Sequence, residues 1–294
     1  MDDSNVSGAR VAPSGLGWPA WWLVCQRELH ELWVGGKALR LLLVYTVIVG
    51  GVSFVSVQNS LQDPTPPKEL VWSTLQICVY VSVCMGLIIG ADSVSGARER
   101  AALEMLLLTP ASRRQIVVGK FLASLSPWPA ALAVTAPCLA VLSQGDPIFG
   151  AALAWGAFLG TLVVVGFVAL AMLVSYWSSS NRTSLFVSLT LYLLFLLPAL
   201  LPGRAQKGLV GKFFQRANPL AAVDQLLERL LVNNNTFHDY RSWLQGPLSF
   251  LILVMGLLFL YAAPRLRLYP GRVRLPRLRR VRIARGLPVA IGGK

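Results

Sequence analysis

Six apolar stretches, each long enough to cross a lipid bilayer, constrain the fold of this chain more than any other feature. They cover residues 39–58, 70–91, 116–142, 149–177, 183–202 and 246–263. A helix needs about 20 apolar residues to span the hydrocarbon core. Hydrophobic residues make up 55% of the 294 and charged residues only 14%, a balance too apolar for a soluble domain. The sequence therefore predicts an all-α integral membrane protein with six transmembrane helices.

Lysine and arginine set the predicted orientation, because these residues are enriched in the cytoplasmic segments of membrane proteins. With the N-terminus inside, all but seven of the 27 basic residues fall in cytoplasmic segments. Six of the seven lie in the last external loop and weaken the assignment: Arg204, Lys207, Lys212, Arg216, Arg229 and Arg241. We expect a multi-pass protein of the prokaryotic inner (plasma) membrane with both termini in the cytoplasm.

Four regions follow from this pattern. They are a flexible N-terminus (1–17), an interfacial amphipathic helix (18–38), a six-span permease-like domain (39–264) and a basic cytoplasmic tail (265–294). The first 17 residues lack the basic start of a signal peptide, so they are not expected to be cleaved as one. In the helix at 18–38, Trp22 and Trp33 lie on one side and Arg27 and Glu28 on another. This pattern is typical of an elbow helix that lies along the membrane surface.

A second amphipathic helix is predicted outside the membrane, between the fifth and sixth spans. Asn218 and Pro219 suit its N-cap and first helical position. From Leu220, apolar residues recur at helical spacing as far as Asn233. We expect this helix to rest on the outer leaflet, and a re-entrant element is the alternative, because helical spacing does not fix depth.

Two pairs of glycines four residues apart permit close approach between helices. They are Gly86 and Gly90 in the second span and Gly156 and Gly160 in the fourth. Packing within the chain is favoured over dimerisation.

The sequence offers no constellation that points to catalysis or to a metal site. His30 and His238, the two histidines, are expected on opposite sides of the membrane. The four cysteines lack paired metal-ligand spacing and are interpreted as small packing residues. Asp92, at the end of a span, is interpreted as a solvated terminal residue rather than a proton relay. We therefore predict that the chain is not an enzyme.

A phosphate-binding loop is missing as well. ATP-binding chains carry G-x-x-x-x-G-K followed by Ser or Thr, and the nearest approach here, Gly211 and Lys212, has Phe213 in the hydroxyl position. We expect no cofactor to be bound by this chain.

Residues 96–120, GARERAALEMLLLTPASRRQIVVGK, are predicted to form a helical hairpin in the cytoplasm between the second and third spans. Residues 98–108 are good helix formers, which predicts that the second span continues as a helix beyond the membrane. Pro110 ends that helix, and the capping box of Ser112 and Gln115 begins the next. Basic anchoring at the membrane explains the charged flanks but leaves the apolar tip, residues 105–108, without a partner.

This segment resembles the cytoplasmic signature of type-two ABC transporter permeases, which have six spans. The resemblance extends to the surface helix with Arg27 and Glu28 and to the Asn-Pro of the last external loop, and it covers most of residues 18–264. Ala97, Ala101 and Ala102 depart from the Glu and Gly-Thr that are frequent in the family. These changes leave helix formation intact.

The resemblance implies a permease subunit of an ATP-driven exporter. Two cytosolic ABC ATPase subunits, which hold the ATP and Mg, would dock on the hairpin, and a second permease, identical or related, would complete the pathway. The ATPase-coupling residues so implied are Arg98, Glu99, Arg100, Glu104, Met105, Leu106, Leu107, Leu108, Arg113 and Arg114. The alternative is a non-transporting membrane anchor that relays ATPase motion to another protein. The substrate is left open.

The tail from residue 265 alternates arginine with aliphatic residues, and its regularly placed prolines exclude a long helix. Contact with anionic lipid is favoured, and an acidic protein surface is the second interpretation. Nucleic acid is not an expected partner, because stacking aromatic residues are scarce in the tail. The predicted contact residues are Arg272, Arg274, Arg277, Arg279, Arg280 and Arg282.

Overall fold

The computed structural model describes residues 19–62, 65–100, 111–143, 145–200, 215–233 and 241–262. The helices in these ranges are α1 (Ala20–Val34), α2 (Lys37–Gln62), α3 (Pro67–Glu99), α5 (Arg113–Leu125), α6 (Pro127–Leu142), α7 (Ile148–Trp177), α8 (Asn181–Leu200), α11 (Pro219–Leu231), η1 (Arg241–Leu244), α13 (Gln245–Gly256) and η2 (Leu257–Ala262). Six helical segments are long and apolar enough to cross a membrane: Lys37–Gln62, Pro67–Glu99, Arg113–Leu142, Ile148–Trp177, Asn181–Pro198 and Ser242–Leu260. The predicted all-α, six-span fold is confirmed.

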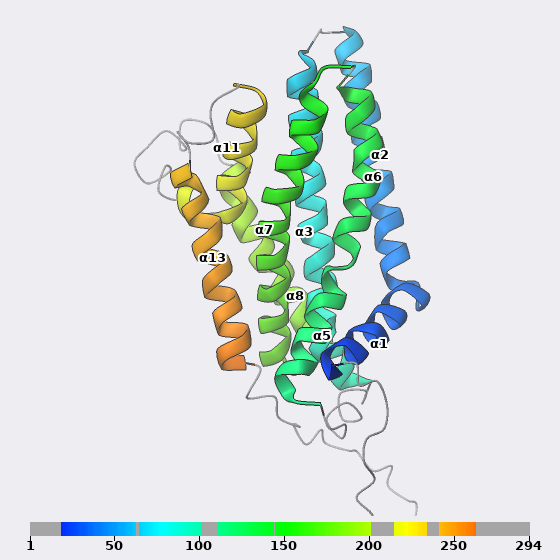
Figure 1. Cartoon of the computed structure of the whole chain (residues 1–294), viewed down its shortest axis with the longest axis vertical. Helices are drawn as coiled ribbons and strands as arrows, with labels where there is room; N and C mark the ends of the chain where they lie inside the picture. The colour runs from blue at the N-terminus through cyan, green and yellow to red at the C-terminus, as the bar shows by residue number, and fades with distance from the viewer. Residues whose placement is uncertain are drawn as a thin grey trace, which may run out of the picture.

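The spans run side by side along the long axis of the molecule (Figure 1), and α3 and α7 form its centre. About two thirds of the apolar window of α3 (61%) and of α7 (67%) is buried inside the chain, against 22% for α2 and 17% for α8. Glycine explains the close central contact. A Cβ on Gly90 would lie 2.9 Å from the carbonyl oxygen of Val168, and Gly86 and Gly156 have neighbours just as close across the same helix pair.

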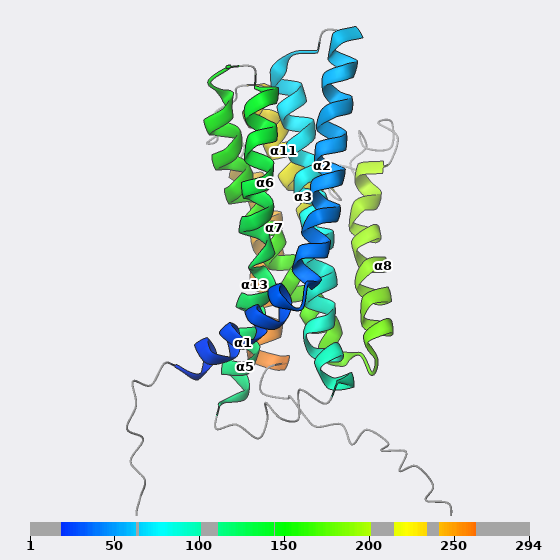
Figure 2. The same cartoon turned by 90° about the vertical axis from the view of Figure 1, so that its right-hand side faces the viewer.

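Helix α1 lies across one end of the bundle, at an angle to the spans (Figure 2). The same end carries the C-terminus of α3, the start of α5 and the turn between α7 and α8, and we call it the α1 end. Gly36 adopts a φ of 73° in the turn from α1 to α2, a left-handed conformation that favours glycine. Since the number of spans is even, the described chain both begins and ends at the α1 end.

The third span is two helices rather than one. The sequence predicts a single apolar stretch over 116–142, but α5 ends at Leu125 and α6 begins at Pro127. Proline has no N–H to donate, and its ring clashes with a carbonyl oxygen of the preceding helical turn. The helical hydrogen-bond pattern is therefore interrupted at Pro127. Ser126 N donates instead to Ala123 O at 3.1 Å. The side chain of Ser126 accepts a hydrogen bond from Trp33 Nε1 at 3.0 Å, which joins α1 to this break.

Helix α11 forms where the sequence predicts an external helix, and its predicted cap is confirmed. Asn218 Oδ1 accepts from Leu220 N at 3.0 Å, and Pro219 is the first helical residue. The apolar side of α11 packs against α3, α7, α8 and α13 of the same chain. Asn218 Nδ2 also donates to Phe195 O within α8 at 2.5 Å. The helix is therefore one of the packed helices of the bundle, at the end away from α1 (Figure 1).

Candidate functional site

The candidate site lies at the α1 end, where the chain leaves α3 and returns as α5. Of the predicted coupling residues, five are described, namely Arg98, Glu99, Arg100, Arg113 and Arg114. The other five, Glu104, Met105, Leu106, Leu107 and Leu108, lie outside the described residues, as do the predicted lipid contacts of the tail, Arg272, Arg274, Arg277, Arg279, Arg280 and Arg282.

Helix α3 does not continue unbroken through the predicted range 98–108. It ends at Glu99, and Arg100 is its C-cap with φ −84° and ψ 6°. The backbone N–H of Arg100 still donates to Gly96 O at 3.1 Å, so the last turn of α3 is closed. Arg100 therefore marks the boundary between the span and the segment 101–110.

Arg98 and Glu99 attach the end of α3 to the turn between α7 and α8. Arg98 Nη1 donates to Ser178 O at 3.0 Å, and Asn181 N donates to Glu99 Oε1 at 2.7 Å. Hydrogen bonds that involve a charged group are stronger than those between neutral groups. These two residues, which the resemblance assigns to the rim of an ATPase contact, thus have partners within the chain.

Serine hydroxyls extend the same attachment one turn deeper. Ser175 Oγ on α7 donates to Ala91 O at 2.6 Å and accepts from Ser95 N at 2.8 Å. Ser184 Oγ on α8 donates to Ala91 O at 3.0 Å. Because these groups are buried, water cannot readily replace their hydrogen bonds. The bonds therefore attach the last turns of α3 to both α7 and α8.

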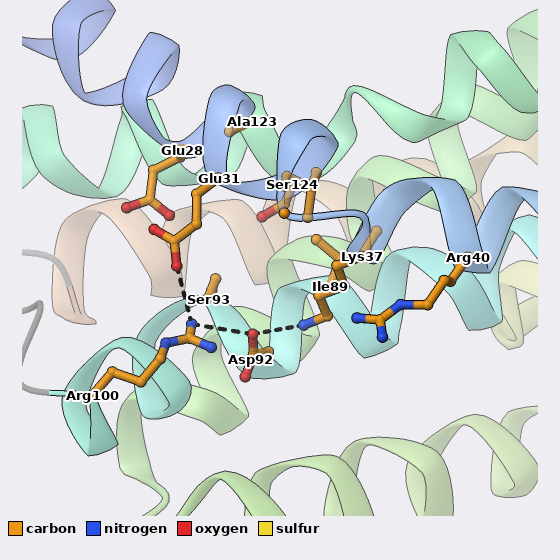
Figure 3. Close-up of a pocket in the computed structure, with 12 residues that line it drawn as sticks. Glu28, Glu31, Lys37, Arg40, Ile89, Asp92, Ser93, Arg100, Ala123 and Ser124 are labelled. Carbon is orange, nitrogen blue, oxygen red and sulfur yellow. Dashed lines mark hydrogen bonds and ion pairs between the residues drawn. The ribbon is translucent and has the colours of Figure 1, made fainter.

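Asp92 is a buried carboxylate at the centre of an ionic cluster, so its interpretation as a solvated terminal residue is wrong. The residue is 9% exposed. Lys37 Nζ lies 2.6 Å from Asp92 Oδ2, Asn181 Nδ2 donates to Oδ1 at 2.7 Å, and Arg100 Nη2 lies 3.4 Å from Oδ2. A carboxylate at this depth needs such partners, because burying an unpaired charge is costly. Figure 3 shows Lys37 and Arg100 on either side of Asp92.

Helix α1 contacts this cluster through Glu31, while its Glu28 pairs with a lysine on α5. Arg100 Nη2 lies 3.7 Å from Glu31 Oε1 (Figure 3), a half-exposed pair. Glu28 Oε1 accepts from Lys120 Nζ at 2.7 Å, and Lys120 on α5 is only 2% exposed. Glu28, predicted as an elbow residue, is therefore the partner of a buried lysine.

The remaining described residues of the prediction lie at the surface of α1 and α5. Arg27 is exposed, and Trp22 is 38% exposed with its ring 5.9 Å from that of Trp21. Arg113 and Arg114 are exposed in the first turn of α5. The predicted capping box is confirmed in front of them, since Ser112 N donates to the Gln115 side chain at 2.9 Å and Gln115 N to Ser112 Oγ at 3.3 Å.

Sequence reasoning missed Lys37, Lys120 and Asn181. A signal existed for Lys120, a lone cation inside an apolar stretch, which needs a partner if it is buried. Across the described residues, no group of three or more His, Cys, Asp or Glu side chains is placed to hold a metal ion.

Two comparisons relate this chain to known proteins. Residues 46–267 match the sequence model of a family described as "ABC-2 family transporter protein". The chain is also similar to the "Probable ABC transporter permease protein NosY" of Pseudomonas aeruginosa, with 24% identity over 186 residues, which is 61% of this chain and 68% of that protein.

Proposed function

This chain belongs to the ABC-2 family of transporter proteins and is a multi-pass membrane subunit of the permease type, and on this premise we propose that it is the permease of an ATP-driven exporter. The predicted membership of the type-two ABC permease family is confirmed. Catalysis in this family belongs to separate ATPase subunits.

The proposed docking surface for these ATPases is the segment between α3 and α5. Leu106, Leu107 and Leu108, flanked by Met105, fill an apolar groove of the ATPase, and Arg113 and Arg114 lie at its rim together with Glu104. The exposure of Arg113 and Arg114 in the first turn of α5 supports this placement. ATP and Mg are held by the partner.

The ionic cluster around Asp92 is the observation that carries the proposed coupling. Arg100 leaves α3 toward the docking segment and contacts Asp92 and Glu31, so it connects that segment to α3 and α1. Arg98 and Glu99 connect the same point to the turn between α7 and α8. A displacement of the docking segment by ATPase closure is therefore passed to several spans at once, because short charge-assisted contacts resist separation.

A second permease, identical or related, completes the proposed pathway. Helices α2 and α8 support this arrangement, because they bury only a small share of their apolar surface within the chain. Phe186 and Leu193 on α8 are 72% and 53% exposed. These faces contact lipid or the second permease. Export from the cytoplasm and location in the prokaryotic inner membrane, with both termini inside, are part of the same proposal.

Reconstitution of the chain with its ATPase in liposomes tests this function. We expect ATP-dependent movement of a labelled solute or lipid across the bilayer, and hydrolysis that depends on the permease. Hydrolysis without movement of any tested solute or lipid would favour the alternative, a membrane anchor that relays ATPase motion to another protein. ATPase activity that is identical with and without this chain would contradict both.

A further inference from the structure

A polar cavity of about 260 Å³ opens at the α1 end between α1, the start of α2 and the last turns of α3 (Figure 3). Its charged lining consists of Glu28, Glu31, Lys37, Arg40, Asp92 and Arg100. The coupling described above uses the pairs within this lining but leaves the cavity itself, and Arg40, without a role.

The charges around the cavity do not balance. Glu28 pairs with Lys120, Asp92 pairs with Lys37, and Arg100 contacts both Asp92 and Glu31. The described lining with its ion-pair partners thus holds four cations, Lys37, Arg40, Arg100 and Lys120, against three carboxylates, which leaves one positive charge.

Of the cations that line this cavity, Arg40 is the one with no ion pair to a carboxylate among the described residues. It is exposed at the mouth of the cavity, and Figure 3 shows its guanidinium turned toward Lys37. Arginine presents several N–H donors in a planar fork that matches a phosphate, and lysine adds a point charge beside it. The pair is suited to a ligand with one negatively charged phosphodiester.

The surface of α2 beyond Arg40 indicates that such a ligand also carries apolar chains. Leu43, Val44 and Val47 follow Arg40 at positions +3, +4 and +7, and therefore lie on the same side of the helix. They are 65%, 52% and 65% exposed. Since α2 begins at Lys37 and is the first span, this apolar strip runs from the cavity into the hydrocarbon region. A soluble anion could use the cations but would gain nothing from the strip.

We propose that this cavity binds one phospholipid, with its phosphate between Arg40 and Lys37 and its acyl chains along Leu43, Val44 and Val47. A lipid with a single negative charge, such as phosphatidylglycerol, compensates the one excess positive charge. The site is distinct from the basic tail at 265–294. It does not depend on the proposed transport function, because it requires only that α2 spans the membrane.

Native mass spectrometry of the purified full-length chain tests the proposal. After removal of loosely bound lipid in detergent, we expect one phosphatidylglycerol molecule to be retained, and phosphatidylcholine to be retained several-fold less. Arg40→Gln should lower the retention of phosphatidylglycerol about tenfold, since the phosphate loses its forked donor. Arg40→Lys should restore part of it, because the charge returns without the fork.

Arg27→Gln is the matched control. Arg27 is an exposed arginine on α1 that does not line the cavity, so this variant loses the same charge at the same end of the chain. Both variants keep the tail, so any lipid held there contributes equally to each. Equal loss in Arg27→Gln and Arg40→Gln would overturn the proposal, because it would indicate general attraction to positive charge.

A soluble phosphate is distinguished in the same experiment. Glycerophosphoglycerol, which carries the same phosphodiester headgroup without acyl chains, should not displace the retained lipid at equal concentration. If it displaces the lipid, the apolar strip contributes nothing and a phospholipid site is contradicted. If Arg40→Gln retains as much phosphatidylglycerol as the parent protein, the proposed site is contradicted as well.

Discussion

Lys37 Nζ lies 2.6 Å from Asp92 Oδ2, so the first residue of α2 is bonded to a carboxylate near the end of α3, 55 residues further along the chain. The same carboxyl accepts from Asn181 at the start of α8. One side chain therefore sets the relative positions of three spans at the α1 end. Removing its charge should disturb all three.

Asp92→Asn is expected to lower the free energy of unfolding by about 1–3 kcal/mol. The amide still offers an oxygen to Asn181, but Lys37 and Arg100 lose their anion. The loss is smaller than for a fully buried pair, because the Lys37 side chain is 30% exposed. Thermal unfolding in detergent, followed by tryptophan fluorescence, measures it. Glu69→Gln, which removes an exposed carboxylate at the other end of α3, is the control and should unfold like the parent protein.

The pair of Glu28 and Lys120 should show strong coupling in a double-mutant cycle. Glu28→Gln leaves Lys120 buried without an anion, at 2% exposure, and should cost about 3–5 kcal/mol. Glu28→Gln combined with Lys120→Met removes the stranded charge and should recover most of this loss. Thermal unfolding of the four proteins measures the coupling. Losses that simply add would show that the ion pair does not hold α1 to α5.

Leu107→Asp should remove ATPase subunits from the purified complex, because a charged side chain cannot enter an apolar groove without losing its hydration. Co-purification from membranes and ATPase activity in liposomes measure the effect. Leu107→Met keeps an apolar side chain of similar volume and should retain the ATPase. Unchanged assembly and transport with Leu107→Asp would contradict the proposed docking surface.

Gly90→Ala should destabilise the bundle by about 1–3 kcal/mol. The added Cβ would lie 2.9 Å from Val168 O and 3.0 Å from Ala171 Cβ, and a backbone oxygen in a helix cannot move aside cheaply. Gly50→Ala is the matched control, since a Cβ on Gly50 meets nothing within 4 Å. Its effect on thermal unfolding should be small or favourable. Equal effects of the two substitutions would contradict the close contact between α3 and α7 at Gly90.

Asp224 on α11 should make stability depend on pH. Burial raises the pKa of its carboxyl from 3.8 to about 7, and Gln76 and Tyr80 on α3 oppose this while Glu228 adds to it. Its Oδ1 is buried without a hydrogen-bond partner among the described residues. Because the folded state binds the proton more tightly than the unfolded state, stability should fall as pH rises from about 4 to about 7.

The corresponding measurement is the difference in unfolding temperature between pH 5 and pH 8. Asp224→Asn cannot ionise, so it should lose this component and be more stable than the parent protein at pH 8 by on the order of 2–3 kcal/mol. If the variant keeps the parent pH dependence, another group is responsible.

The sequence predicted those features that depend on neighbours along the chain. The six spans follow from runs of apolar residues, and the caps at Ser112 and Asn218 follow from side chains that reach a backbone N–H two or three residues away. The break before Pro127 could also have been predicted, because proline inside a helical run interrupts the hydrogen-bond ladder.

The candidate site was predictable only in part, because its contacts join distant segments. Asp92 was interpreted as solvated, since nothing near it in the sequence shows that Lys37 and Asn181 lie beside it. The position of α11 has the same cause. Its amphipathic pattern shows that one side of the helix must be buried. Helical spacing alone does not distinguish burial against lipid from burial against other helices of the chain, which is what the structure shows.

The interruption between Leu125 and Pro127 gives the third span a joint of its own. Below it, α5 is fastened to α1 through Lys120 and Glu28, while Trp33 of α1 reaches Ser126 at the joint itself. Above it, α6 packs with α2 and α3. A displacement of the start of α5 would therefore be passed to α1, and at Ser126 to the start of α6, where Pro127 supplies no N–H to continue the helical hydrogen-bond pattern.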